Sequence, residues 1–372
     1  NPLGAGVYQN YARNKLNVEV WNASLRATLD KGKHFLQFGN SLSYEKINDV
    51  LKEWEYQDSA GYSLPNRLGP LSLYKSMNTK SNLNIIRLQG FIQDNILLNN
   101  QFSIQAGIRY NTNNLNNELL VSPRIGFSYT PTYWKKDIVF HASAGMYNQP
   151  PFYREMRNPD GVVNTALQAQ KSYQLSVGMD YNFQMMGRSF RLNTETYYKN
   201  MKDVVPYDID NVRVRYFGTN SATAYAYGLE TRLYGELVKG AESWVSIGLM
   251  NTKENLNGDF YYKYFNAAGQ EITSKTQDQA VVDSAKTDIG WLRRPVDRRI
   301  NVGVFFQDYL STNKNFKVSL SIIYGSNLPY NISGSVKYRN ALEIPSYIRT
   351  DIGFSALLLD GDKSKRRSHN PL

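Results

Sequence analysis

The sequence predicts an all-β protein, a transmembrane antiparallel up-and-down β-barrel to which this chain contributes about thirteen strands. Three observations predict it. Apolar and polar residues alternate with a period of two, short and long connections alternate between the runs, and charged residues stand in the middle of the polar faces. Alternation at period two places the two sets of side chains on opposite faces of a strand. Lipid suits the apolar face, and a water-filled lumen suits the charged one.

The clearest alternation runs from Tyr173 to Phe183. Its odd-numbered positions hold Tyr, Leu, Val, Met, Tyr and Phe, and its even-numbered positions hold Gln, Ser, Gly, Asp and Asn. The even-numbered face is too polar for a protein core. Because a soluble barrel with an apolar core would show the same period, the prediction requires that Leu175, Val177 and Met179 do not lie inside a dry core.

The other predicted strands are longer than the average of about 5–6 residues in globular proteins, which favours a membrane barrel. No segment repeats apolar residues at helical spacing, and no run approaches the 18 or so apolar residues of a membrane-spanning helix. The strands are expected near 14–30, 33–48, 81–97, 100–112, 118–131, 137–149, 167–184, 188–206, 213–236, 242–256, 296–310, 315–329 and 346–360.

The connections between these strands fall into two classes that alternate along the chain. Although two members of the second class are short, all the longest connections belong to it, as in outer-membrane barrels with short periplasmic turns and long extracellular loops. The first class lies near 30–33, 97–100, 131–137, 184–188, 237–242 and 311–315, and the second near 49–80, 112–118, 149–166, 206–213, 257–295 and 330–345.

The composition excludes several kinds of chemistry. The 372 residues include no cysteine, so thiol catalysis and cysteine-based metal sites are excluded. His34, His141 and His369 are far apart and lack metal-ligand spacing. A Ser-x-x-Lys pattern at 311–314 lies in a predicted polar turn without the helix that its chemistry needs, and no phosphate-binding motif is present. We therefore expect no catalytic residue and no metal. The net charge of +11 indicates either attraction to lipopolysaccharide phosphates or an acidic ligand, or basic residues that simply decorate loops.

Several motifs between residues 81 and 236 resemble the barrel of TonB-dependent outer-membrane receptors. A hairpin carries an aromatic-x-Gln-Asp element and then a Gly-x-Arg-Tyr element, and a Ser-Pro-Arg strand, a proline-bearing loop and a Tyr-Gly-x-Glu strand follow in order. These motifs are Gly90–Asp94, Gly107–Tyr110, Ser122–Pro131, Ala142–Pro151, and Asn220 with Tyr227–Glu230.

The resemblance implies a 22-stranded barrel in the bacterial outer membrane, filled by an N-terminal plug through which the TonB complex acts. It implies no cofactor and no nucleic-acid partner. No signal-peptide pattern opens the chain, and a basic, turn-like segment (363–369) stands near its end. We therefore expect residues 1–372 to form a single partial barrel domain, with the plug and the closing strands outside this chain. A surface lipoprotein over the barrel is a further possible partner.

The charged residues on the polar faces have two interpretations. They either line a ligand path, or they bond to one another and to a plug, as polar lumens commonly require. We expect them to face the lumen or the plug: Arg87, Arg109, Arg124, Asp180, Arg191, Glu195, Glu230, Arg232, Arg349 and Asp351.

The long loops are the predicted ligand-binding elements, because aromatic and arginine side chains contribute most to recognition. Aromatic residues next to strand ends have the alternative role of membrane-interface anchors. The candidates are Trp54, Tyr56 and Tyr62 in loop 49–80, Phe152, Tyr153 and Arg154 in loop 149–166, and Tyr261, Tyr262, Tyr264 and Arg293 in loop 257–295.

Two classes of function fit these features. The first is an outer-membrane receptor that imports a scarce small-molecule, glycan or peptide nutrient with TonB, its loops capturing the ligand. The second is a passive porin-like barrel or a structural, adhesin-like one. A soluble β-sandwich that binds a ligand is a weaker third hypothesis.

Overall fold

One large antiparallel sheet dominates the computed structural model, which describes residues 8–57, 72–210, 213–310, 315–331 and 336–358. Its long strands follow one another in chain order, and each pairs with the next long strand. They are β2 (Lys15–Lys31), β3 (His34–Gln57), β4 (Ser72–Leu97), β5 (Phe102–Asn113), β6 (Leu119–Tyr129), β7 (Asp137–Gln149), β8 (Gln170–Met185), β9 (Arg188–Val204), β12 (Ala222–Val238), β13 (Ala241–Leu256), β17 (Ile300–Tyr309), β18 (Phe316–Gly325) and β21 (Tyr347–Ala356).

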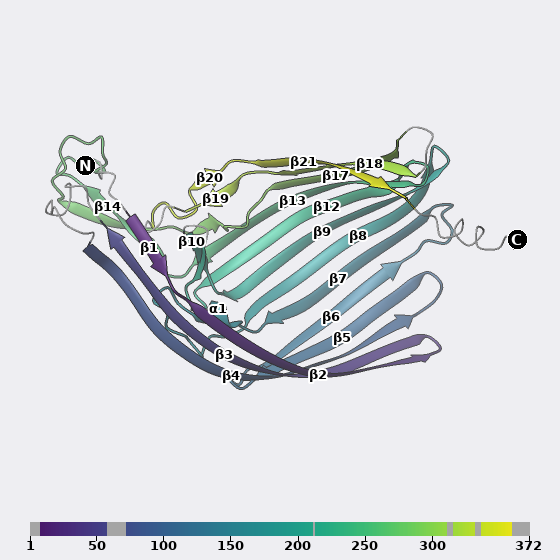
Figure 1. Ribbon diagram of the computed structural model, residues 1–372, viewed down its shortest axis with the longest axis horizontal. Coiled ribbons are helices and arrows are strands. Elements are labelled where there is room, and N and C mark those ends of the chain that lie inside the picture. Colours follow the sequence, from purple (N-terminus) through teal and green to yellow (C-terminus); the bar gives the residue numbers. More distant parts are fainter. Residues whose placement is uncertain (1–7, 58–71, 211–212, 311–314, 332–335, 359–372) are drawn as a thin grey trace, which may run out of the picture.

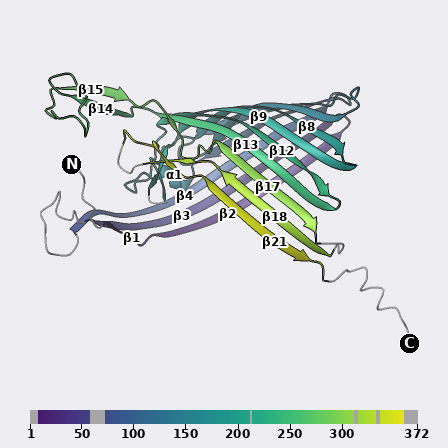
Figure 2. The same ribbon diagram turned by 90° about the horizontal axis from the view of Figure 1, so that it is seen from above.

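The sheet curls into a trough that is open between β2 and β21 (Figures 1 and 2). Two short strands extend it at one end: β1 (Tyr8–Ala12) pairs with β3, and β16 (Trp291–Arg293) pairs with β13. Three separate two-stranded hairpins lie in the connections. They are β10 (Tyr207–Asp210) with β11 (Arg213–Tyr216), β14 (Phe260–Phe265) with β15 (Asp283–Asp288), and β19 (Leu328–Tyr330) with β20 (Leu342–Ile344).

The thirteen long strands confirm the strands expected from the alternation pattern, one for one. Three predicted strand boundaries lie far from the observed ones. The segment 49–80 is not a loop throughout, because β3 continues to Gln57 and β4 begins at Ser72. The strand expected over 213–236 begins at Ala222, and residues 213–216 belong instead to the β10–β11 hairpin, whose own alternation imitates the start of a barrel strand.

The apolar face of the sheet is the outer one. Leu175 and Val177 are 53% and 50% exposed, so they do not lie inside a dry core. On the opposite face, the single helix of the described residues, α1 (Tyr153–Met156), lies inside the curve of the sheet (Figure 1). Its Tyr153 packs on Ile47 of β3 and Ile85 of β4, so those positions mark the inner face.

Aromatic rings gather on the outer face near the short turns. Phe102 stacks on Tyr129 with ring centroids 4.5 Å apart, and Tyr181 stacks on Phe183 at 5.0 Å. Such a girdle is typical of barrel residues at a membrane–water interface. Among the described residues no helix has both the length and the apolarity needed to span a membrane.

The connections are sorted by length between the two ends of the strands (Figure 1). At one end the turns are short, such as residues 186–187 between β8 and β9. At the other end lie the longer connections, including 150–169 between β7 and β8 and the segment 257–299 that carries β14, β15 and β16. This sorting is the arrangement expected of an outer-membrane barrel with its long loops outside the cell.

The Tyr-Gly-x-Glu motif has a steric reason for its glycine. A Cβ on Gly228 would meet the Leu249 carbonyl oxygen and lie 2.7 Å from Tyr197 Oη, whereas a Cβ on Gly248 would meet only Asn301 Cβ, at 3.9 Å. We therefore expect Gly228→Ala to destabilise the folded barrel by about 1–3 kcal/mol and Gly248→Ala to leave it nearly unchanged. Urea unfolding followed by heat-modifiable gel mobility measures both, and equal losses would contradict the steric explanation.

Candidate functional site

The charged residues predicted for the lumen lie on the inner face of the sheet. Strand register places all ten on the face that carries Ile85: Arg87, Arg109, Arg124, Asp180, Arg191, Glu195, Glu230, Arg232, Arg349 and Asp351. That they contact a plug stays a prediction.

Several of these inner-face charges bond to one another or to aromatic rings. Asp180 pairs with Arg191 at 3.0 Å, and Arg87 pairs with Glu45 at 3.2 Å. The Arg232 guanidinium lies 4.8 Å from the Trp244 ring centroid. The inner face is therefore a polar, largely self-satisfied lining.

The connection between β7 and β8 folds inward over this lining at the loop end. Tyr153 is 7% exposed, and its hydroxyl donates a hydrogen bond to Asp49 Oδ2 at 2.7 Å. Arg157 Nη1 contacts the same carboxylate oxygen at 2.7 Å. Arg87 Nη2 also donates to the Pro151 carbonyl at 2.9 Å. A buried carboxylate on the sheet thus holds this loop-end segment against the inner face.

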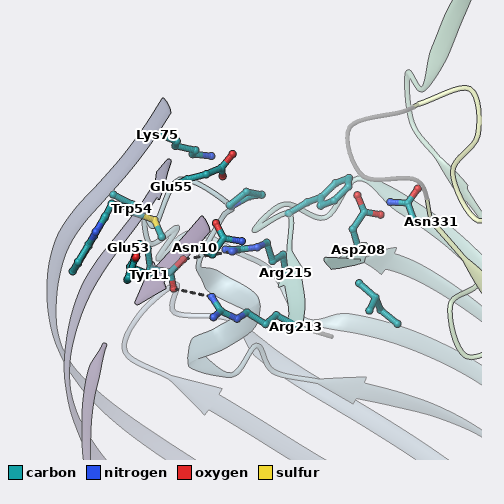
Figure 3. A pocket seen from close by; sticks show the side chains of 14 residues that line it. Asn10, Tyr11, Glu53, Trp54, Glu55, Lys75, Asp208, Arg213, Arg215 and Asn331 are labelled. Atoms are coloured by element: carbon teal, nitrogen blue, oxygen red, sulfur yellow. Dashed lines mark hydrogen bonds and ion pairs between the residues drawn. The ribbon is translucent and has the colours of Figure 1, made fainter. Parts of the chain in front are cut away.

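The β10–β11 hairpin approaches β3 from the other side of the lumen. Glu53 Oε2 accepts from Arg215 Nη2 at 3.4 Å, and Glu53 Oε1 lies 3.8 Å from Arg213 Nη1 (Figure 3). Asn14 Nδ2 donates to Glu53 Oε1 at 2.6 Å. The hairpin in turn is held by Arg339, which lies 3.8 Å from Asp208. Residues more than 160 positions apart therefore meet at the mouth of the trough.

Two adjoining cavities, of about 360 and 580 Å³, lie on either side of this bridge. They share Glu53, Met77, Pro159, Arg213 and Arg215. Their charged lining comprises Arg154, Arg157, Arg213, Arg215 and Lys75 against Asp49, Glu53, Glu55 and Asp208. The larger cavity has four arginines facing two carboxylates, so it favours an anionic or oxygen-rich ligand.

The candidates of the first predicted loop are not loop residues. Trp54 and Tyr56 lie on β3, and they pack around Tyr11 with ring centroids 5.8 and 6.0 Å away. Trp54 alternates with Glu53, so its ring turns away from the Glu53–arginine bridge (Figure 3). Tyr62 lies outside the described residues. Trp54 is nevertheless among the residues that line the smaller cavity, together with Tyr11.

The second predicted loop does line the site. Arg154 is exposed, faces the larger cavity, and makes one long contact of 3.5 Å to the Val214 carbonyl. Phe152 packs edge-on against Tyr216 at 5.6 Å. Tyr153, which the sequence suggested for ligand capture, also lines the larger cavity, with its side chain mostly buried and its hydroxyl bonded to Asp49. That bond holds the segment in place, and ligand contact by Tyr153 stays a prediction.

The third predicted loop lies apart from both cavities. Tyr261, Tyr262 and Tyr264 are on the β14–β15 hairpin, and none of them lines either cavity. Arg293 is on β16 and is engaged with Asp297 at 2.6 Å and with Glu343. Sequence reasoning placed Arg293 with the ligand contacts, whereas its guanidinium is occupied by an internal network.

Of the nine charged residues that line the two cavities, the sequence pointed to Arg154 alone, and Asp49, Arg213 and Arg215 are the most consequential of those it missed. Asp49 fell in a segment predicted to be a loop, and the two arginines fell in a segment predicted to be a barrel strand. The alternation of Arg213 and Arg215 with Val214 and Tyr216 was the available signal. That alternation predicts a strand, but it does not distinguish a barrel strand from a hairpin in a loop, and it does not identify the residues that the arginines contact.

Burial raises the pKa of Tyr153 to about 12, with the hydrogen bond to Asp49 as the second cause. Since the folded-state pKa exceeds the usual value of 10.0, the neutral phenol's contribution to stability is full below pH 10 and is lost as the pH rises towards 12. We expect the tyrosinate absorbance titration at 295 nm to lose its latest step in Tyr153→Phe. A Tyr262→Phe control, at a half-exposed ring, should leave that step in place. An unchanged late step in Tyr153→Phe would contradict the assignment.

Comparison with solved structures gives the same fold. The copper transporter OprC superposes with a TM-score of 0.59 at 12% identity, over 94% of this chain and 49% of that one. The siderophore receptor PiuA from Acinetobacter baumannii gives 0.59 at 13% identity, over 93% of this chain and 50% of that one. The ferric yersiniabactin uptake receptor FyuA from Yersinia pestis gives 0.58 at 15%, over 94% and 48%. The chain therefore spans about half the length of these proteins.

No match was found among curated protein sequences. The family model described as "TonB dependent receptor-like, beta-barrel" matches residues 2–356, which is nearly the whole chain. The exposed apolar outer face, the polar inner face and the sorted loops agree with this match and with a place in the bacterial outer membrane. The chain belongs to the β-barrel family of TonB-dependent receptors.

Proposed function

We propose that this chain is the barrel portion of a receptor that takes up a scarce nutrient across the outer membrane, with TonB acting through a plug domain. The proposal rests on the way in which two connections close over the lumen at the loop end of the sheet. Two connections fold inward and line adjoining cavities with four arginines, Arg154, Arg157, Arg213 and Arg215. A receptor requires a formed binding surface at its mouth, and these inward-folded, cross-linked segments supply one.

The proposed ligand chemistry follows from the same residues. Arg154 and Arg213 are exposed guanidiniums whose protein contacts are long, at 3.5 and 3.8 Å. A carboxylate, phosphate or catecholate oxygen entering the larger cavity would replace these weak contacts with short, charge-assisted ones. Glu53 would then be displaced in part from Arg213. An acidic or oxygen-rich metal chelate is therefore the ligand class that we propose.

The test uses the full-length protein expressed in cells with and without TonB. The probes are a ferric catecholate siderophore, copper(II) and a neutral sugar of similar mass, each followed by radiolabel uptake. We expect uptake of the anionic chelate to require TonB. The paired substitution Arg154→Ala with Arg213→Ala should weaken chelate binding at least about tenfold, since each charge-assisted bond contributes roughly 1.5–3 kcal/mol.

The matched control is Lys275→Ala, which removes an exposed positive charge from residues outside both cavities. It should leave uptake unchanged. TonB-independent entry of all three probes would favour the second hypothesis, a passive porin-like or structural barrel. Entry of the neutral sugar alone would contradict the proposed ligand class and leave the receptor mechanism in place.

A further inference from the structure

On the outer face of β2, β3 and β4, a band of apolar side chains is followed, towards the loop end, by charged and amide side chains. Trp21, Tyr44 and Ile86 form one cross-strand row, and all three are exposed, at 71%, 38% and 47%. In the next outward-facing row towards the loop end, Lys46 stands between Glu19 and Asn84. The change from apolar side chains to lysine and amide side chains therefore occurs between two successive outward-facing rows.

This surface contains four lysines from three neighbouring strands, which we call the lysine patch: Lys15, Lys46, Lys52 and Lys80. All four are exposed. Lys15 and Lys80 both pair with Val50, so their backbones lie two strand spacings apart, about 10 Å. Lys46 and Lys52 are six residues apart on one face of β3, which corresponds to about 20 Å.

Within the part of the chain that the structure describes, none of the four lysines has a carboxylate within ion-pair distance. Glu19 is the single acidic side chain among the outward residues of these rows. The intervening positions hold amides instead, which can hydrogen-bond both phosphate and sugar oxygens: Asn17, Asn48, Asn78, Asn82 and Asn84. Among the described residues of these rows, the patch therefore has four positive charges against the single carboxylate of Glu19, which lies opposite Lys46.

We propose that the lysine patch binds the phosphorylated headgroup of a glycolipid in the outer leaflet. The patch adjoins the apolar band, so acyl chains of a bound lipid would lie against Trp21 and Ile86 while its phosphates reach Lys46 and Lys80. Its extent, about 10 by 20 Å, exceeds a single phosphodiester and fits a headgroup with two phosphates on a sugar scaffold. Basic clusters next to a membrane-spanning surface are the usual sites of anionic lipid binding.

The proposal is tested on the full-length protein in neutral detergent by native mass spectrometry. The probes are bisphosphorylated lipid A, dephosphorylated lipid A, phosphatidylglycerol and inorganic phosphate. The test variant is K15Q/K46Q/K52Q/K80Q, and the charge-matched control is K135Q/K136Q/K239Q/K275Q, which changes four exposed lysines outside the patch. Heat-modifiable gel mobility establishes that each variant is folded.

We expect the wild type and the control to retain bisphosphorylated lipid A, and the patch variant to bind it at least about tenfold more weakly. Dephosphorylated lipid A should bind poorly to all three proteins. Should the fourfold variant not fold, K15Q/K80Q takes its place, with an expected weakening of at least about fivefold. Equal retention of lipid A by wild type and patch variant would overturn the proposal. Equal binding of phosphatidylglycerol, or full competition by inorganic phosphate, would also overturn it, by showing that the headgroup is not recognised.

Discussion

Replacing Asp49 by alanine is expected to release the segment between β7 and β8 from the inner wall of the barrel. The carboxylate is 3% exposed and accepts from both Tyr153 and Arg157 at 2.7 Å. Its removal leaves a buried phenol and a partly buried guanidinium without their acceptor, which costs about 3 kcal/mol of local stability. Hydrogen exchange of residues 152–157 should therefore accelerate by about two orders of magnitude.

Two matched variants separate this effect from a general loss of charge. Asp160→Ala removes a carboxylate of the same segment, but that carboxylate is 73% exposed and pairs with Lys75 at 3.7 Å. A surface pair of this kind contributes about 0–1 kcal/mol, so exchange should hardly change. Asp49→Asn keeps an acceptor and should show an intermediate effect. Equal exchange in Asp49→Ala and the wild type would refute the role given to Asp49.

Replacing Val177 by arginine is expected to abolish most assembly of the full-length protein into the outer membrane. Val177 is 50% exposed on the outer face, at the centre of the apolar run of β8. An arginine near the bilayer midplane of a barrel costs about 2–4 kcal/mol. Barrel proteins that fold slowly or unstably aggregate before they reach the membrane. The amount of the variant in outer-membrane fractions, measured by quantitative blots, should therefore be much lower than that of the wild type.

The adjacent residue offers the control. Ser176 faces the lumen, where its hydroxyl lies 2.9 Å from that of Ser143. Ser176→Arg adds the same charge to a wet, polar surface, so assembly should fall far less. The fold requires lipid at the outer face and water at the inner face. Equal assembly of the two variants would contradict this difference.

The strand pattern was predictable from the sequence wherever one face meets lipid. Across β8, lipid selects apolar residues on one side and water selects polar residues on the other, so the period of two is evident. Beyond the apolar band that contrast disappears. The segment Asp49–Gln57 continues β3 with Leu51 and Glu53 on one face and Lys52 and Trp54 on the other, and this mixture imitates a loop.

The site was less predictable, because its contacts join distant parts of the chain. Arg154 was identified from residue type alone, since arginines in long loops are good recognition residues. The hydrogen bond between Arg215 and Glu53 joins residues that are 162 positions apart in the sequence. A local sequence pattern cannot predict a contact between residues so far apart. Tyr153 was named for ligand contact from its residue type alone, and nothing in the sequence indicated that the loop folds inward and bonds its hydroxyl to Asp49.

The most direct test of the central claim, that the apolar face meets lipid and the polar face meets the lumen, is a spin-label scan. The chain contains no cysteine, so single cysteines from 173 to 183 can be labelled one at a time in the protein reconstituted into bilayers. The fold predicts maxima of oxygen accessibility at the odd-numbered positions, including 175 and 177, with low accessibility there to a water-soluble nickel chelate. Oxygen maxima at the even-numbered positions would contradict it.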